Sequence, residues 1–194
     1  MKDQFFAFVS RMKYINRWGL MKNTSTENIK EHSHSVAMLA HALGVINNVY
    51  LGGNADPEHL AAVALYHDAE EIITGDMPTP VKYFSPTLRA AVREAENDAK
   101  DTLLSMLPDP MQEVYADLLY CRDEQTERLV KAADVLDAYI KCIEELKSGN
   151  LEFEGARKAT LRKLESMNCP EAEIFCDRFL GAFEKSLDEQ RELE

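Results

Sequence analysis

Long apolar runs are absent from this sequence of 194 residues. No stretch approaches the roughly 20 apolar residues that a membrane-spanning helix needs. The first residues, MKDQFFAFVSRMKYINRW, also lack the apolar core of a secretory signal peptide. We therefore expect a soluble, cytoplasmic protein with no membrane partner.

Basic side chains are scarce. The chain carries 22 Lys and Arg against 34 Asp and Glu, which gives a formal net charge of −12. An acidic surface of this kind repels a phosphate backbone, so a polymeric nucleic-acid partner is not expected. A small phosphorylated ligand stays compatible, because one pocket can carry its own local positive charge.

Cysteine is present, but without the spacing of a known framework. No CxxC pair occurs among Cys121, Cys142, Cys169 and Cys176. Reduced thiols in a cytosol are the default interpretation. A metal clip built from two of them is the alternative, and the absence of metal-clip spacing disfavours it.

Alternation of apolar and polar residues with period two, the pattern of a half-buried strand, is also absent. Apolar residues make up 45% of the chain, enough for the core of one domain, and no linker or repeat divides it. The prediction is an all-α fold, a single-domain helical bundle over residues 1–194. Helices are expected at 3–15, 28–50, from Pro57 through the block HDAEE at 67–71, 86–107, 110–120, 126–149, 151–167 and 171–187.

Loops are expected where glycine, proline and short polar residues gather, at 17–28 (RWGLMKNTSTEN) and at 74–86 (TGDMPTPVKYFSP). Asp56 followed by Pro57 is a favourable helix start, because the carboxylate can cap the first turn and proline suits its first position. Gly149 suits the end of the helix 126–149.

Charged residues interrupt the apolar helix expected after Pro57, in the block HDAEE. Such side chains are rarely buried without partners. On a helix, Glu71 lies one turn along from both His67 and Asp68. These two diverge by about 100° but can converge on an ion beside the helix. Glu70 points elsewhere and is predicted to be solvated.

Two further polar residues stand among apolar neighbours: His32 near the start of the helix 28–50, and Asp134 in LVKAADVLDAYI. With His67 and Asp68 they form a mixed nitrogen and oxygen set suited to a borderline divalent ion. Such a set leaves positions open for water and substrate, as at a catalytic metal. Glu71 beside it can serve as general base or acid.

Simpler interpretations stand beside this one. An HD dipeptide often arises by chance, and Asp134 can instead cap its helix or pair with Lys131. Asp137 can support an ion from outside the ligand set, but an exposed helix face is the favoured interpretation. Ordinary surface or packing roles are expected for His34, His41 and His59.

Four blocks of sequence are more specific than the HD dipeptide. They are INRWGLM, the TEN and EHS triplets around residue 30, YHDAEEIITGDMPTPVKY and KAADVLDAYIKCIEE. Together they resemble the HD-domain 5′-deoxynucleotidases of bacteria, within the HD superfamily of metal-dependent phosphohydrolases. The resemblance covers residues 14–146 approximately, and the helices in 151–187 are expected to pack on this HD-type core.

The resemblance implies hydrolysis of deoxyribonucleoside 5′-monophosphates to deoxynucleoside and phosphate, with discrimination against ribonucleotides. It implies a homodimer that uses Co2+, with Mn2+ or Cu2+ as substitutes. The implied metal ligands are His32, His67, Asp68 and Asp134, and the implied catalytic residues are Glu71 and Arg17. The implied substrate-binding residues are Arg17, Trp18, His32, Asp68, Asp76, Met77, Pro78, Thr79 and Asp134.

Within this set, the resemblance assigns the 5′-phosphate to Arg17, the sugar to Trp18 and the 3′-hydroxyl to Asp76. Trp18 would disfavour a 2′-hydroxyl. A guanidinium does suit phosphate oxygens, and prolines do stiffen a loop. Without the resemblance, Trp18 is better interpreted as core and Arg17 as a surface charge.

Departures from the family pattern are modest. Glu70 and His34 stand where smaller or apolar residues are seen, and Asp137 replaces a cysteine. Three other functions remain alternatives: an HD phosphohydrolase for a dNTP or a cyclic nucleotide, a non-catalytic nucleotide-binding protein, and a structural helical adaptor. The lack of an evident basic triphosphate-binding cluster disfavours the first, and the intact Glu71 and ligand set disfavour the second.

Overall fold

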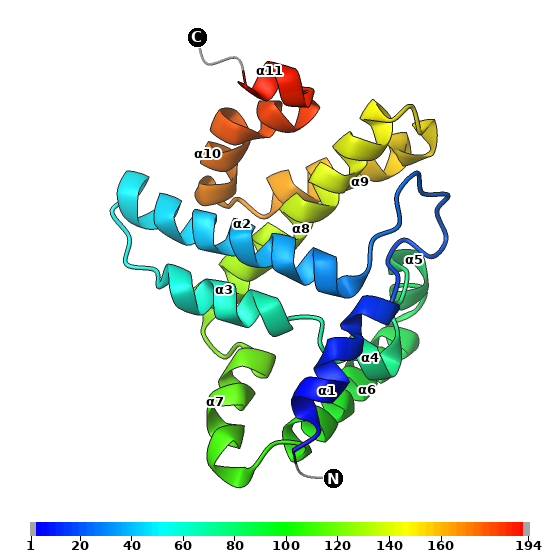
Figure 1. The fold of residues 1–194 in the computed structure, drawn as a ribbon, viewed down its shortest axis with the longest axis vertical. Helices are drawn as coiled ribbons and strands as arrows, with labels where there is room; N and C mark the ends of the chain where they lie inside the picture. Colours follow the sequence, from blue (N-terminus) through cyan, green and yellow to red (C-terminus); the bar gives the residue numbers. More distant parts are fainter. Residues whose placement is uncertain (1–2, 192–194) are drawn as a thin grey trace.

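Helices make up nearly all the regular structure of the computed structural model, which describes residues 3–191 (Figure 1). Their bounds are α1 Phe5–Val9, α2 Ile29–Tyr50, α3 Pro57–Tyr66, α4 Glu71–Thr74, α5 Thr79–Lys82, α6 Pro86–Ser105, α7 Asp109–Tyr120, α8 Glu124–Lys147, α9 Glu154–Ser166, α10 Pro170–Phe179 and α11 Leu187–Arg191. Short 3-10 segments cover Ser10–Tyr14, Leu151–Phe153 and Leu180–Glu184. Within residues 3–191 the strand-like pairing is limited to one isolated bridge, Asn16 to Asn28. The all-α prediction is confirmed.

The main hydrophobic core lies between α2, α3 and α8 (Figure 1). Fully or almost fully buried leucines meet there, among them Leu43 of α2, Leu60 of α3 and Leu136 of α8. Phe175 of α10 packs against the same core. In the part of the chain that the structure describes, none of the helices is both long and apolar enough to cross a membrane.

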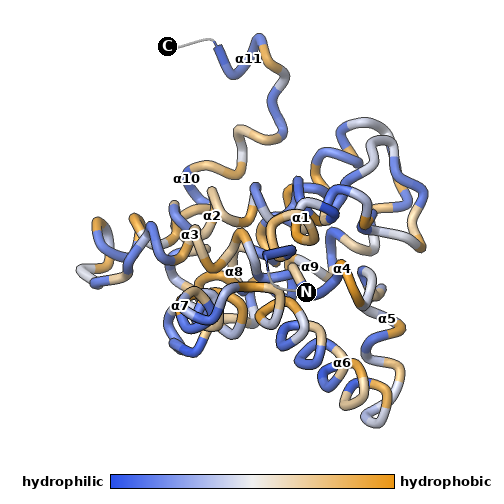
Figure 2. Tube along the Cα trace, turned by 60° about the horizontal axis from the view of Figure 1, so that its bottom comes forward, coloured by the Kyte–Doolittle hydropathy of each residue, from blue (hydrophilic) through white to orange (hydrophobic). Residues whose placement is uncertain are grey.

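A second apolar cluster joins α1, α6 and α7. Phe5 and Leu103 are fully buried in it. The turns of α6 alternate between apolar and polar residues along the tube in Figure 2, because this helix buries one face only. Ala69 belongs to this second cluster, whereas Ala64 belongs to the main core. The chain therefore crosses from one core to the other between Ala64 and Ala69.

Polar caps fix where the long helices begin. The side chain of Asn28 accepts from the N–H of Glu31, and the Glu31 carboxylate accepts from the N–H of Asn28, so a capping box starts α2. Asp56 accepts from the N–H of His59, directly before Pro57. The predicted start of α3 is confirmed.

The prediction of one helix from Pro57 through HDAEE is wrong. α3 ends at Tyr66, residues 67–70 form turns, and α4 begins at Glu71. Hydrogen bonds between residues three apart form this turn, such as the one from the N–H of Glu71 to the carbonyl of Asp68. The helix is interrupted where the chain leaves one core for the other. The helix propensity of HDAEE does not predict this interruption.

Other boundaries differ in smaller ways. The segment 3–15 is α-helical as far as Val9 and 3-10 beyond it. A short helix, α5, lies inside the predicted loop 74–86. Its Pro80 stands in the first turn, where proline is tolerated. The predicted helix 171–187 ends as α10 at Phe179, and α11 is a separate short helix.

Candidate functional site

Four side chains from three parts of the chain converge beside the main core. His32 comes from α2, His67 and Asp68 from the turn after α3, and Asp134 from α8. Nε2 of His32 lies 3.4 Å from Oδ2 of Asp68 and 3.3 Å from Oδ1 of Asp134. Nε2 of His67 lies 3.1 Å from Oδ2 of Asp68. We call these four residues the His–Asp cluster.

Both histidines are held through Nδ1, which leaves Nε2 directed at the cluster. Nδ1 of His67 donates to the carbonyl oxygen of Ala64 at 2.7 Å, since a carbonyl can only accept. Nδ1 of His32 lies 2.7 Å from Oδ2 of Asp137. The two Nε2 atoms are buried and have no hydrogen-bond partner. Because buried polar atoms are normally paired, these two nitrogens indicate a ligand position.

The donor set fits a divalent metal ion. Ligand atoms of His32, His67 and Asp68 lie within 4.8 Å of one another, and Asp134 adds an oxygen on the same side of His32. Donors that share one tetrahedral ion at bond lengths of about 2.0–2.2 Å lie roughly 3.3–3.6 Å apart, close to the separations observed here. Imidazole nitrogens mixed with carboxylate oxygens suit a divalent transition metal.

The two cluster carboxylates are held in their anionic form. Burial alone would raise the pKa of Asp68, but His67 and His32 bring that pKa well below its ordinary value. Burial opposes ionisation of Asp134 in the same way, and Lys131 and His32 outweigh it, so the pKa of Asp134 is also well below normal. Ionised carboxylates are the form that binds a cation.

Asp134 pairs with Lys131, and the same carboxylate also faces His32. Its Oδ1 faces His32, while its Oδ2 accepts from Nζ of Lys131 at 2.5 Å. Pairing with Lys131 does not withdraw Asp134 from the cluster, because the two oxygens of one carboxylate serve different partners.

Asp137 is buried, so the prediction of an exposed helix face for it is wrong. It stands one turn after Asp134 on α8, and both carboxylates therefore face the same side. Its Oδ2 contacts His32 and lies 3.7 Å from an NH1 atom of Arg17. The predicted phosphate residue and a cluster histidine thus share one neighbour.

Glu71 lies beside the cluster in negatively charged surroundings. Burial raises the pKa of Glu71 to about 10, and the nearby carboxylates of Asp68, Asp76 and Glu70 act in the same direction. Its Oε2 atom is buried without a hydrogen-bond partner. A cation held by the cluster would offset this accumulation of negative charge.

Glu70 is buried, and the prediction that it is solvated is wrong. Its Oε1 faces Nζ of Lys100 on α6 at 3.5 Å. Burial raises the pKa of Glu70 to about 7, although Lys100 opposes the change. The direction that helical spacing assigns to Glu70 does not apply, because α3 has already ended.

Arg17 and Trp18 stand at the start of the predicted loop 17–28, and Glu27 near its end orients both. The N–H of Arg17 donates to the carbonyl of Glu27 at 2.9 Å. The Glu27 carboxylate accepts from NH1 of Arg17 at 3.0 Å and from Nε1 of Trp18 at 2.9 Å. One acidic side chain therefore holds the guanidinium and the indole side by side.

The backbone of Trp18 is left-handed, with φ +60°. Such a conformation costs a residue other than glycine on the order of 1–3 kcal/mol and is concentrated at functional sites. The indole packs against Phe153 with 5.3 Å between ring centroids. Its orientation is thus set by the backbone, by Glu27 and by an aromatic neighbour.

Glu145 of α8 ties the middle of the same loop to the protein. Its buried carboxylate accepts from the N–H and hydroxyl of Thr24 at 2.9 and 2.7 Å, from Nζ of Lys141 at 2.7 Å and from Nδ2 of Asn150 at 2.8 Å. Lys141 also donates to the carbonyl of Ser25 at 2.9 Å. We call these five residues the loop anchor.

Asp76 is the member of the predicted substrate loop that reaches this region. Burial raises the pKa of Asp76, whereas Arg17 and a hydrogen bond from the Trp18 backbone oppose the change. Of the next three residues, Met77 and Pro78 are half-buried, and Thr79 is exposed at the start of α5. Within residues 3–191, no hydrogen bond or ion pair joins these three side chains to the His–Asp cluster.

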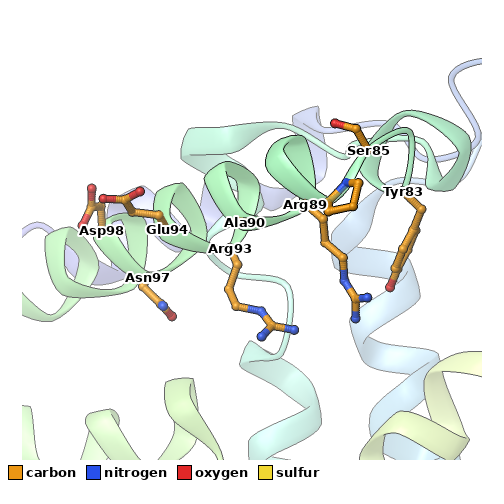
Figure 3. Close-up of a pocket in the computed structure, with 9 residues that line it drawn as sticks. Tyr83, Ser85, Arg89, Ala90, Arg93, Glu94, Asn97 and Asp98 are labelled. Carbon is orange, nitrogen blue, oxygen red and sulfur yellow. The ribbon is translucent and has the colours of Figure 1, made fainter.

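A separate surface groove of about 890 Å³ runs along α6. Figure 3 shows the side chains of Tyr83, Arg89 and Arg93 projecting to the same side of α6, where they line the groove. The guanidinium carbon of Arg89 lies 5.1 Å from the centre of the Tyr83 ring. No member of the His–Asp cluster lines this groove, so the groove and the proposed metal site are different places.

Sequence reasoning missed Glu27 and the loop anchor. A signal for part of the anchor is present in the sequence, because four polar residues follow one face of α8 at helical spacing: Asp134, Asp137, Lys141 and Glu145. A polar stripe on a helix rich in alanine and leucine indicates a face that meets other polar groups. Glu27 carries no comparable signal, because a loop has no periodicity.

Comparison with known proteins gives a consistent result. A family model described as 5′-deoxynucleotidase YfbR-like matches residues 4–183. The chain is 46% identical over 190 residues to a 5′-deoxynucleotidase of Photobacterium profundum, which covers 97% of this chain and 98% of that protein. It is 45% identical over 190 residues to the 5′-deoxynucleotidase YfbR of Escherichia coli, covering 97% and 96%.

Solved structures share the fold. An HD-domain phosphohydrolase from Listeria innocua superposes with a TM-score of 0.80 at 25% identity, covering 93% of this chain and 88% of that one. The HD phosphohydrolase DatZ of cyanophage S-2L, bound to dA and one catalytic Zn2+ ion, gives a TM-score of 0.64 at 21% identity, covering 90% and 95%. The latter likeness concerns the fold alone.

Removal of the loop anchor should loosen the segment that carries Trp18. In Glu145→Ala, the donors of Thr24 and Asn150 lose their acceptor and the buried ammonium of Lys141 loses its carboxylate. Trp18 is the single tryptophan of the chain, so its fluorescence reports on the loop directly. We expect emission shifted to longer wavelength and stronger quenching by acrylamide.

The neighbouring Glu144 provides the control, because it is exposed on the same helix. Glu144→Ala removes the same charge and should leave the emission of Trp18 unchanged. An unchanged spectrum in a folded Glu145→Ala protein would show that the anchor does not hold the loop.

Proposed function

Since the chain belongs to the YfbR-like family of 5′-deoxynucleotidases, we propose that the His–Asp cluster is its catalytic centre. The chain is an enzyme that hydrolyses deoxyribonucleoside 5′-monophosphates to a deoxynucleoside and phosphate. One observation carries the assignment of the centre: the buried Nε2 atoms of two histidines face two carboxylates and have no hydrogen-bond partner.

His32, His67, Asp68 and Asp134 would together hold one divalent cation. Such an ion, when bound, polarises a phosphate oxygen and lowers the pKa of a water molecule. We propose Co2+ as the ion, with Mn2+ or Cu2+ as substitutes. The mixed nitrogen and oxygen donors suit any of these, so the choice of ion rests on the family resemblance.

Arg17 supplies positive charge to the 5′-phosphate. Its guanidinium is planar and permanently charged, and Glu27 holds one of its nitrogens at 3.0 Å. Negative charge shifts onto the phosphate and the leaving oxygen as the bond between phosphorus and the 5′-oxygen breaks. Arg17 stabilises this charge and keeps the phosphate in a fixed orientation.

Glu71 moves a proton during the reaction. Water attacks phosphorus, the bond from phosphorus to the 5′-oxygen breaks, and this oxygen takes up a proton to become the hydroxyl of the deoxynucleoside. The carboxyl of Glu71 can accept the proton of the attacking water or give one to the leaving oxygen. Its place near the cluster residue Asp68 and the loop residue Asp76 supports a role toward the substrate.

Trp18 forms the wall that rejects ribonucleotides, and Asp76 lies near the 3′-hydroxyl. Met77, Pro78 and Thr79 complete the substrate side of the loop. The indole of Trp18 is fixed by Glu27 and Phe153, so it cannot easily retreat from an added 2′-hydroxyl. A steric clash of about 2.7 kcal/mol corresponds to roughly hundredfold discrimination.

We propose a cytoplasmic location, as expected from the sequence, and a homodimer, which rests on the family resemblance. Residues 1–194 would act as one HD domain, with the motifs in residues 14–146 approximately. The packing of Leu164 from α9 and Phe175 from α10 against the main core supports a single unit.

The alternatives differ in their products. A dNTP hydrolase would release triphosphate or pyrophosphate, and a hydrolase of cyclic nucleotides would open a phosphodiester. A nucleotide-binding protein without activity would release no phosphate, and a structural adaptor would be indifferent to chelators. The buried ligand set and the unpartnered oxygen of Glu71 favour a phosphomonoesterase over the last two.

Phosphate release from a panel of nucleotides tests the proposed function. We expect rapid release from deoxyribonucleoside 5′-monophosphates, slow release from ribonucleoside 5′-monophosphates, and none after treatment with a chelator. Adding Co2+ back should restore activity and raise the melting temperature, because an ion that binds the folded state stabilises it. Activity and melting temperature that both ignore the chelator would refute the metal centre.

Replacement of Glu71 should separate catalysis from metal binding. Glu71→Gln keeps the size of the side chain but cannot transfer a proton, so turnover should fall by about 10²–10⁴-fold. Co2+ content should stay near one ion per chain. In Asp68→Ala, by contrast, metal and activity should be lost together.

Glu70→Gln is the matched control for Glu71→Gln, because Glu70 is an adjacent buried carboxylate that faces Lys100. It should change turnover far less. Nearly normal turnover in Glu71→Gln would remove Glu71 from the mechanism.

Replacement of Trp18 should narrow the preference for deoxyribonucleotides. In Trp18→Ala, AMP should be hydrolysed faster relative to dAMP by about tenfold, which corresponds to ~1.4 kcal/mol of lost discrimination. The ratio of kcat/KM for the two substrates measures this change. Trp18→Phe keeps a flat ring and should keep most of the discrimination, and an unaltered ratio in Trp18→Ala would show that another residue excludes ribonucleotides.

A further inference from the structure

One buried carboxylate contacts two parts of the proposed active site through the same oxygen atom. Oδ2 of Asp137 lies 2.7 Å from Nδ1 of His32 and 3.7 Å from NH1 of Arg17. The side chains of His32 and Asp137 are 0% and 9% exposed, so water competes little for this contact. We infer that Asp137 is a positioning residue that fixes His32 as a metal ligand and ties it to Arg17. The inference rests on the proposed metal centre.

The contact decides which nitrogen of His32 is available to a cation. A carboxylate accepts hydrogen bonds, so Nδ1 carries a proton, and in the neutral imidazole that would bind a cation Nε2 keeps its lone pair. Nε2 is the atom that lies beside Asp68 and Asp134. Without Asp137, the proton can move to Nε2 and the ring can turn, and either change removes the lone pair from the cluster.

The other cluster histidine is held differently. Nδ1 of His67 donates to the carbonyl of Ala64, a neutral group three residues before it. His32 instead faces a carboxylate from another helix. A charged acceptor behind a metal-bound imidazole raises its basicity, and loss of such partners typically weakens metal binding or activity by about 10–100-fold. The two histidines should therefore differ in how strongly their supporting contact affects the site.

Packing alone does not account for an acid at position 137. Its neighbours on α8, Ala133 and Leu136, are fully buried and apolar. A carboxylate among them is costly unless it is paired, and an apolar side chain would fill the same space without that cost. The pairs with His32 and Arg17 offset the cost.

The shared oxygen also couples the proposed metal ligand to the proposed phosphate ligand. Glu27 holds Arg17 at 3.0 Å on one side, and Asp137 lies on another. A displacement of Asp137 would therefore reach both groups. Because Asp137 of α8 contacts both His32 and Arg17, it would help to keep Arg17 in a constant position relative to a cation held by His32.

Co2+ affinity of metal-depleted and reloaded protein tests the inference. Asp137→Ala removes acceptor and charge, and Asp137→Asn keeps an acceptor oxygen without the charge. We expect Asp137→Ala to weaken Co2+ binding by about 10–100-fold in competition with a chelating indicator, and Asp137→Asn to fall between it and the wild type. Glu144→Gln, which removes an exposed charge from the same helix, should bind Co2+ like the wild type.

A second readout separates positioning from a purely structural role. In protein loaded with diamagnetic Zn2+, the Nδ1 proton of His32 should give a protected NMR signal in the wild type and in Asp137→Asn, and lose it in Asp137→Ala. A role confined to folding would lower the free energy of unfolding but leave the Co2+ affinity of the folded protein unchanged. Should Asp137→Ala fail to fold, Asp137→Asn carries the same comparison of affinities.

Wild-type Co2+ affinity in both Asp137 variants would overturn this inference alone, as would equal weakening by Glu144→Gln. A wild-type protein that binds no Co2+ and no Zn2+ would overturn the proposed metal centre and this inference with it.

Discussion

Two buried imidazole nitrogens without hydrogen-bond partners, facing two ionised carboxylates, are the constraint on which the rest of the structure depends. Polar atoms in such numbers are costly to bury unless they are paired. Three of the four cluster members have a supporting contact outside the cluster. The carbonyl of Ala64 supports His67, Asp137 supports His32, and Lys131 supports Asp134. The remaining ligand atoms of His32, His67 and Asp68 lie close together, and Asp134 lies beside His32, which favours a metal site over a self-paired polar core.

The tight turn at residues 67–70 exists because the chain changes cores there. Ala64 is fully buried in the core of α2, α3 and α8, and Ala69 is fully buried in the core of α1, α6 and α7. Small side chains at both ends let the backbone pass close to each core. His67 and Asp68 stand between the two and are thereby carried to the face of α2 and α8. The position of two proposed ligands is thus a consequence of apolar packing on either side of them.

Apolar periodicity and the specific sequence blocks are enough to predict the helical class and most of the long helices. The long helices, the start of α3 at Asp56 and Pro57, and the all-α class follow from apolar spacing and capping. The turn at residues 67–70 and the burial of Glu70 cannot be predicted in this way. The end of α3 depends on packing between distant segments rather than on local helix propensity. Asp137 was misjudged for a related reason: its spacing from Asp134 was visible, but its partners His32 and Arg17 come from other parts of the chain. Local pattern identifies which residues share a helix face, and only the fold identifies what that face meets.

An enzyme with a net charge of −12 repels an anionic substrate, so positive groups near the site must offset the negative electrostatic potential there. Screening at physiological salt limits surface charges to a reach of about 8 Å, so the groups near the cluster decide the potential that the substrate meets. Arg17 lies on one side of the cluster, and Lys131 contacts Asp134 on another. Burial and the charges of Lys131 and Lys82 lower the pKa of Lys163, although Asp134 opposes the change. With a divalent cation in the cluster, Arg17, Lys131 and the cation would together offset the buried carboxylates that surround it. In the proposed function Arg17 and the cation would meet a single phosphate, whereas the acidic exterior disfavours nucleic-acid polymers.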